Sequence, residues 1–331
     1  MAGKPSGQTA LLLGAKVVIS IALFAWLFHR VQWSNILAAI EHARGEWLVA
    51  AFSLLVLSNV LGSYQWNRLM RAVGIQIPFW KVCSYYHVGL FFNNFLPANV
   101  GGDLARIFDA SRAGHTRTTA LSTVLMDRMV GTVALAGLAV LTTLPAIDRF
   151  HLAAIYLGVL GFFAFAVTML WAVFHPSLLH SITRLLARIG LGRFRPTLEE
   201  LAERLGGFRG QRRLFLELFA VATVVQIMRI FVHVLVARAL GIQVDLAYFF
   251  LFVPLLAVIV SLPISLNGIG VREGVGILLF GMVGLDKGSA FSLQFTTYLV
   301  AVAVSLIGGI VFLVRIPHRR AEAQSSRRTT G

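Results

Sequence analysis

The chain has 331 residues, of which 57% are hydrophobic and 13% charged, and its mean hydropathy is +0.79. A soluble domain carries about a quarter charged residues, so this chain has too few charges to cover a water-facing surface. The composition excludes a soluble domain and predicts an all-α polytopic membrane protein. The net charge of +15 does not point to nucleic acid, because most basic residues lie between or after long apolar runs, where topology and anionic lipid explain them.

Six apolar stretches are long enough to span a membrane as helices, which takes about 20 residues. They are 11–28, 47–66, 118–144, 152–174, 214–240 and 288–314. The first follows Lys4 and has no clear cleavage site, so we expect a retained span, with an uncleaved signal as the alternative. The single cysteine, Cys83, permits no internal disulfide.

Two further apolar regions, 80–96 and 246–285, are interrupted by polar and helix-breaking residues. The same motif begins at the end of the first region and lies within the second: a Leu-Pro followed by Gly five residues and Arg nine residues after the Pro. The first copy runs from Leu96 to Arg106 and the second from Leu262 to Arg272. Corresponding breaks in two halves of a membrane protein indicate a substrate site.

The distribution of Lys and Arg predicts the orientation. The basic segment 175–213 and the basic tail after 314 should be cytoplasmic, while the cation-poor connections near 148 and 241–245 should be external. The region 80–96 then begins and ends inside, and 246–285 begins and ends outside. We therefore expect about six full spans plus two broken re-entrant helical hairpins in an inverted-topology repeat, although parity also allows two complete spans in the second region. Irregular backbone at that depth must be surrounded by protein or a wet cavity, so the hairpins should line a shared cavity.

This topology divides the chain into five parts. We predict a first transmembrane helix with an external amphipathic segment (1–46), repeat 1 with a cytoplasmic-side hairpin (47–145), an extra span with a basic amphipathic linker (146–213), repeat 2 with an outer-side hairpin (214–314) and a basic disordered cytoplasmic tail (315–331). Apolar residues at helical spacing from Leu178 to Ile189 predict an interfacial helix, either a gate or lipid sensor or simply a linker, and a second short helix should follow Pro196.

At these motifs the sequence resembles the lysylphosphatidylglycerol synthase transmembrane-region family of flippase-like membrane proteins. The resemblance rests on Tyr64–Met70, the Leu96–Arg106 block, Ala120–Arg128 and Pro263–Glu273, and it covers most of the chain. In larger members this membrane part precedes a soluble aminoacyltransferase domain and is thought to move the modified lipid between leaflets. Two departures stand out: Gly102-Asp103 replaces a more usual Gly-Glu, and Tyr298 lies near a position where a basic residue is expected.

Ionisable side chains inside a membrane cost at least about 2.5 kcal/mol and normally face a cavity or a partner. The candidates for substrate binding combine such residues with the polar and glycine residues of the two motifs. They are Asn99, Gly101, Gly102, Asp103, Arg106, Asp127, Arg128, Asn267, Gly268, Gly270, Arg272 and Glu273.

The glycines should let backbone N–H groups at a helix N-terminus face a phosphate, with Arg106 and Arg272 adding charged contacts. The alternative role of these residues is structural: buried salt bridges that fix the hairpins, with Asp127 and Arg128 each paired to the facing hairpin. Asn93, Asn94 and Asn99 either satisfy hairpin backbone or bind substrate. Arg229 and His233, four apart on one helix face, are either a proton relay or packed residues.

The motifs predict a transporter that moves an anionic, phosphate-bearing lipid or lipid-linked headgroup between leaflets of a bacterial inner membrane, with both termini cytoplasmic. A membrane enzyme and a non-transporting scaffold for a lipid-modifying enzyme are the alternatives. The enzyme hypothesis lacks a paired-carboxylate metal motif or a Ser/His nucleophile arrangement. We expect no metal and no cofactor. An anionic membrane lipid is the expected partner, and a separate lipid-modifying enzyme and a homo-oligomer are both compatible with the interpretation.

Overall fold

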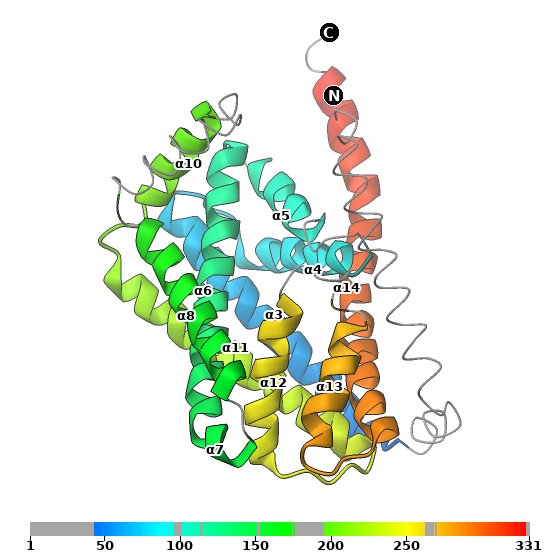
Figure 1. Cartoon of the computed structure of the whole chain (residues 1–331). Coiled ribbons are helices and arrows are strands. Elements are labelled where there is room, and N and C mark those ends of the chain that lie inside the picture. Colours follow the sequence, from blue (N-terminus) through cyan, green and yellow to red (C-terminus); the bar gives the residue numbers. More distant parts are fainter. Residues whose placement is uncertain are drawn as a thin grey trace, which may run out of the picture.

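The computed structural model describes residues 43–95, 101–112, 115–150, 153–173, 175, 195–261, 268 and 270–328. Within them all regular structure is helical (Figure 1). The predicted first span, the interfacial helix around 178–189, Asn99 and Asn267 lie outside the described residues. The short helix predicted after Pro196 is present as α10 (Arg195–Gly206).

Five helices are long and apolar enough to cross a membrane. They are α3 (Gly45–Ala72), α6 (Arg117–Thr143, continued by a short turn to Ala146), α8 (Ala153–Val173), α11 (Arg212–Ala239) and the first part of α14 (Lys287–Arg328). They coincide with the five predicted spans that lie in the described residues. α8 exposes large apolar side chains such as Leu157 (66%) and Phe165 (62%), a surface suited to hydrocarbon rather than water. The prediction of an all-helical polytopic membrane protein is confirmed.

One boundary differs from the prediction. α14 continues as a helix to Arg328, through the residues predicted to form a disordered tail. The reason is local: Ala, Glu, Gln and Arg, which favour helix, dominate this stretch, and it extends a helix that is already nucleated.

Each of the two motif regions forms a pair of short helices. The first pair is α4 (Phe79–Phe95) and α5 (Gly101–Ser111), and the second is α12 (Leu246–Ser261) and α13 (Val271–Gly281). At 1.5 Å per residue the 11-residue helices α5 and α13 are only about 16 Å long, about half the thickness of a hydrocarbon core. The connections that join the first pair to α3 and α6 lie at one end of the molecule, and those that join the second pair to α11 and α14 lie at the opposite end (Figure 1).

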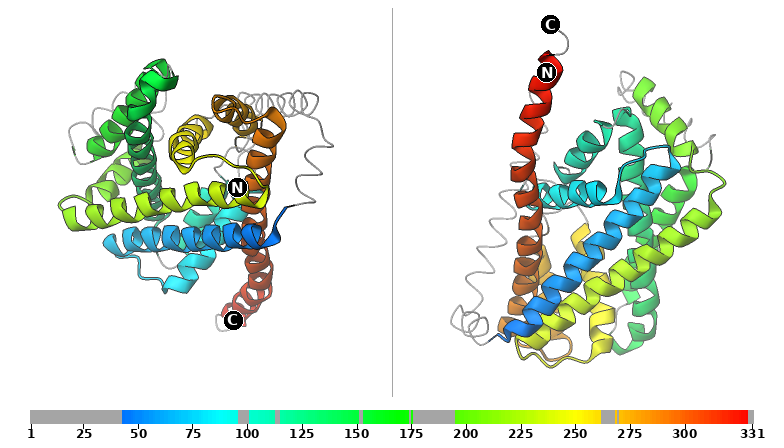
Figure 2. Two further views of the ribbon diagram at one scale, coloured as in Figure 1. Left: turned by 90° about the horizontal axis from the view of Figure 1, so that it is seen from below. Right: turned by 180° about the vertical axis from the view of Figure 1, so that it is seen from behind.

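The long helices form a frame around these pairs. α3 and α11 lie side by side along most of their length, and α4 crosses the bundle transversely (Figure 2). The end of the molecule where α10 lies also holds the α5–α6 connection and the far end of α14, whereas α7 (Ile147–Phe150) and the first turns of α12 lie at the other end (Figure 1).

Glycines allow the transverse helix to pack closely. A Cβ on Gly308 of α14 would overlap the carbonyl oxygen of His87 in α4, and a Cβ on Gly102 of α5 would overlap the carbonyl oxygen of Gly89 in α4. Small residues at such crossings let helix backbones approach closely enough to pack in a membrane. Gly102 of the first motif is therefore required for helix packing.

Candidate functional site

Both short-helix pairs line one cavity of about 540 Å³, as the sequence predicted. Residues from α3, α6, α11 and α14 complete its wall, so the cavity lies between the two halves of the chain. Its lining combines aliphatic side chains with polar and charged ones, the usual composition of a ligand pocket. The polar lining residues are Asn59, Gln65, Tyr86, Asn93, Arg106, Asp127, Arg128, Thr132, Gln226, Arg229, His233, Ser261, Arg272, Thr297 and Ser305.

Arg106 and Asp127 form a buried ion pair in the wall of the cavity. Arg106 Nη2 donates to Asp127 Oδ2 at 2.8 Å, and Gln65 Nε2 donates to Asp127 Oδ1 at 2.9 Å. Arg106 and Asp127 are 6% and 8% exposed. Both carboxylate oxygens of Asp127 are thus engaged, and the pair joins α5 to α6.

Two aromatic rings hold the Arg106 guanidinium in this position. Its central carbon lies 4.2 Å from the centroid of Trp66 and 4.7 Å from that of Tyr86. The Trp66 indole is itself fixed, because Nε1 donates to Thr123 Oγ1 at 3.0 Å. Stacking on ring faces suits the planar guanidinium, and together with the ion pair it gives Arg106 a structural role.

A second ion pair joins the same two helices, this time with the arginine on α6 and the aspartate on α5. Arg128 Nε of α6 donates to Asp103 Oδ2 of α5 at 2.6 Å, and Arg106 Nη1 lies 3.9 Å from Asp103 Oδ1. Each helix therefore supplies one acid and one arginine to the other. This is the arrangement in which the predicted residues fix the hairpin, although the Arg128 side chain remains 47% exposed.

The helix N-termini predicted to receive a phosphate have acceptors from the chain itself. Gly102 N–H donates to Asn93 Oδ1 at 2.9 Å, and Gly270 N–H donates to Glu273 Oε2 at 2.7 Å. Glu273 is 2% exposed and caps α13, where a carboxylate also complements the helix dipole. One oxygen of the Glu273 carboxylate is therefore used to cap α13. Gly268 and Gly270, with φ of +75° and +82°, form the turn that makes this possible.

Arg272 follows this turn and lines the cavity from the second half of the chain. Its guanidinium carbon lies 5.2 Å from the centroid of the Tyr298 ring. Tyr298, which stands where a basic residue was expected, thus offers a ring face to a cation.

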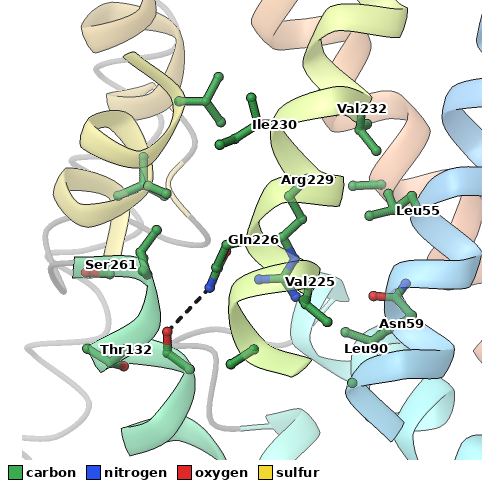
Figure 3. Close-up of a pocket in the computed structure, with 18 of the residues that line it drawn as sticks. Leu55, Asn59, Leu90, Thr132, Val225, Gln226, Arg229, Ile230, Val232 and Ser261 are labelled. Carbon is green, nitrogen blue, oxygen red and sulfur yellow. Dashed lines mark hydrogen bonds between the residues drawn. The ribbon is translucent and has the colours of Figure 1, made fainter. Parts of the chain in front are cut away.

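α11 presents Gln226, Arg229 and His233 to the cavity, spaced three and four residues apart on one face. Gln226 Nε2 donates to the Gly131 carbonyl at 3.4 Å, and the side chain of Arg229 extends beside it (Figure 3). His233 Nδ1 lies 3.0 Å from the backbone carbonyl oxygen of Arg229, so this contact involves the Arg229 backbone and not its guanidinium. The contact is the one a packed helix histidine makes, and the proton relay stays a prediction.

Comparison with known proteins relates the chain to a family of membrane proteins. The family model "Lysylphosphatidylglycerol synthase TM region" matches residues 14–309, which include both short-helix pairs and the whole cavity lining. The chain belongs to this family. The membrane protein PH1989 of Pyrococcus horikoshii is 23% identical over 322 residues, covering 90% of this chain and 95% of the relative. MJ1595 of Methanocaldococcus jannaschii is 25% identical over 118 residues, 35% of each chain. Both are named as UPF0104 membrane proteins, and both are archaeal.

Sequence reasoning missed several cavity residues of this family member. Asn59 and Gln226 lie within predicted spans, Gln65 lies at the end of one, and the contacts of Trp66 and Tyr86 with Arg106 were not predicted. A signal did exist for α11, because Gln226, Arg229 and His233 share a helix face that is otherwise apolar. No comparable spacing connects Trp66 to Arg106, since they meet only through tertiary packing.

The electrostatics of the site follow from these pairings. Four arginines and one aspartate line the cavity, and Asp103 joins them through Arg128. Glu273 follows Arg272 in the sequence and is also counted, so with His233 neutral the four arginines and three acids leave one positive charge. A cavity between two helix pairs that carries an excess of arginine is chemically suited to an anionic group.

Proposed function

We propose that this protein is a transporter that moves an anionic, phosphate-bearing lipid or lipid-linked headgroup between the two leaflets of its membrane. The observation that carries the proposal is the cavity shared by the two short-helix pairs, whose four arginines outnumber the three acids beside them by one. Membership of the lysylphosphatidylglycerol synthase transmembrane-region family supports a lipid-related role.

In this proposal α4–α5 and α12–α13 are re-entrant hairpins of an inverted repeat. Two features support it: the connections of the pairs lie at opposite ends of the molecule, and α5 and α13 are too short to cross a bilayer. The end that carries α10 would face the cytoplasm, because it holds Arg204, Arg209, Arg212 and Arg213. A bacterial inner membrane, rich in anionic phospholipid, suits such a carrier.

The mechanism follows from the sizes involved. A cavity of about 540 Å³ suits a headgroup, so the acyl chains would stay in the bilayer while the headgroup crosses. Rocking of one hairpin against the other would open the cavity to each side in turn. No covalent step is required, so the chain acts as a carrier, and any lipid-modifying enzyme is a separate partner.

Reconstitution tests the proposal. Purified protein in liposomes should accelerate the exchange of fluorescent phosphatidylglycerol between leaflets, measured by reduction of the outer-leaflet label with dithionite. Arg272→Ala should abolish this acceleration while the protein still elutes and melts as a folded protein. Lys287→Ala, which removes an exposed cation at the start of α14 outside the cavity, should transport as wild type. Exchange no faster than in protein-free liposomes would contradict the proposal.

A further inference from the structure

Arg229 differs from the other arginines of the cavity. Arg106 and Arg128 are each paired with an aspartate, and the Arg272 guanidinium lies over the Tyr298 ring. Among the described residues the Arg229 side chain makes no hydrogen bond, ion pair or ring contact, and it lies half-buried in the cavity wall (Figure 3). A charge held inside a membrane protein without a partner is costly, so this position favours an anionic ligand.

Neutral polar groups flank this cation. Asn59 of α3 lies on one side of Arg229 and Gln226 on the other (Figure 3). Gln226 uses its NH₂ group on the Gly131 carbonyl, which leaves its Oε1 as an acceptor. The Asn59 carboxamide makes no hydrogen bond to the described residues, so it offers both a donor and an acceptor. Such groups suit hydroxyls placed beside a phosphate.

Asp127, the carboxylate among the described residues that line the cavity, is already engaged through both of its oxygens. Asp127 accepts hydrogen bonds from Gln65 and Arg106. Asp103 accepts one from Arg128 through Oδ2, while its Oδ1 makes no hydrogen bond to the described residues and lies 3.9 Å from Arg106 Nη1, but Asp103 is not among the described residues that line the cavity. The sequence between the paired helices, 96–100 and 262–267, contains no Asp or Glu that could add another. An ammonium headgroup would therefore enter a positively charged cavity without a counter-ion, which disfavours it.

Given the transport function proposed above, we propose that Arg229 binds the phosphate of the transported lipid. We further propose that the site selects a headgroup with one phosphodiester and hydroxyl groups over a headgroup that carries an ammonium. Arg272, on α13, supplies a second positive charge that transport requires, whereas Asn59 and Gln226 contact the hydroxyls.

Binding to the purified full chain in detergent tests this. The probes are phosphatidylglycerol, phosphatidylethanolamine and lysyl-phosphatidylglycerol, of which the last two carry ammonium groups. Losing a charge-assisted hydrogen bond should weaken phosphatidylglycerol binding by about tenfold to a hundredfold in Arg229→Gln. Arg229→Lys should retain part of the affinity, and Arg213→Gln, an exposed charge removal on the same helix, should bind as wild type. Wild type should prefer phosphatidylglycerol to both ammonium lipids by at least about tenfold.

Three results would overturn the inference: no saturable binding of phosphatidylglycerol by wild type, unchanged affinity in Arg229→Gln, or equal affinity for either ammonium lipid. Equal affinity for soluble glycerophosphoglycerol would also overturn it, because it would assign the site to a free phosphodiester rather than a lipid. The transport proposal fails separately. If binding depends on Arg229 but liposomes show no leaflet exchange, the site stands without transport. If Arg229→Gln exchanges lipid as fast as wild type, transport stands and the assigned residue is wrong.

Discussion

The ion pair between Arg106 and Asp127 allows a quantitative prediction about what holds α5 in place. Arg106→Gln removes the cation and leaves the buried Asp127 carboxylate with a hydrogen bond from Gln65 but without its ion-pair partner. Removing one partner of a buried pair costs about 3–5 kcal/mol, chiefly because the remaining charge is uncompensated. Loss of the contacts with the Trp66 and Tyr86 rings acts in the same direction.

A second substitution separates charge from packing. Asp127→Asn in the Arg106→Gln background removes the stranded charge and leaves two amides that can bond to each other, so it should restore at least half of the lost stability. Thermal unfolding in detergent should show a decrease of the melting temperature on the order of 10 °C for Arg106→Gln. Arg112→Gln, an exposed arginine at the end of α5, should change stability by no more than about 0.5 kcal/mol. A melting temperature for Arg106→Gln equal to that of wild type, or a double variant no more stable than the single one, would refute the reasoning.

Two further predictions concern the framework. Gly308→Ala should destabilise the protein by about 1–3 kcal/mol, because the added Cβ would overlap the His87 carbonyl oxygen. The control Gly274→Ala adds a Cβ in open space and should be neutral or stabilising. Equal melting temperatures for the two variants would be inconsistent with a tight helix crossing at Gly308. Asp286 caps α14, and hydrogen bonds from the Ser289 side chain and backbone hold the pKa of its carboxyl below the usual value. Asp286→Ala should cost about 1 kcal/mol at neutral pH. Because the folded pKa is lowered, the difference in melting temperature should shrink as the pH falls through it, and a difference that grows in acid would contradict this.

The spans and the broken pairs were predictable because each depends on local sequence. Twenty apolar residues in succession have few alternatives to a spanning helix, and Leu-Pro followed by glycines interrupts a helix wherever it occurs. The positions of α4–α5 and α12–α13 followed from that pattern together with loop charges. The helix beyond Val314 was not predicted, because the polar and basic residues there were interpreted as a disordered tail despite the helix propensity of many of them.

Pairing inside the cavity was not predictable to the same degree. The sequence contains Asp103-x-x-Arg106 and the adjacent Asp127-Arg128, but which acid meets which arginine depends on the register of α5 against α6. Likewise, the hydrogen bond from the Gly270 N–H to Glu273 depends on the turn at Gly268 and Gly270 rather than on any spacing visible in the sequence. The result is that Arg106 and Arg128 join α5 to α6 through ion pairs, while Arg229 lines the cavity from α11.

The most direct test of this account is a density map of the protein in nanodiscs that contain phosphatidylglycerol. The account predicts a phosphate-sized feature in the cavity, within hydrogen-bonding distance of the Arg229 guanidinium. A map at the same resolution that resolves these side chains but shows only ordered water in the cavity, at saturating phosphatidylglycerol, would contradict it.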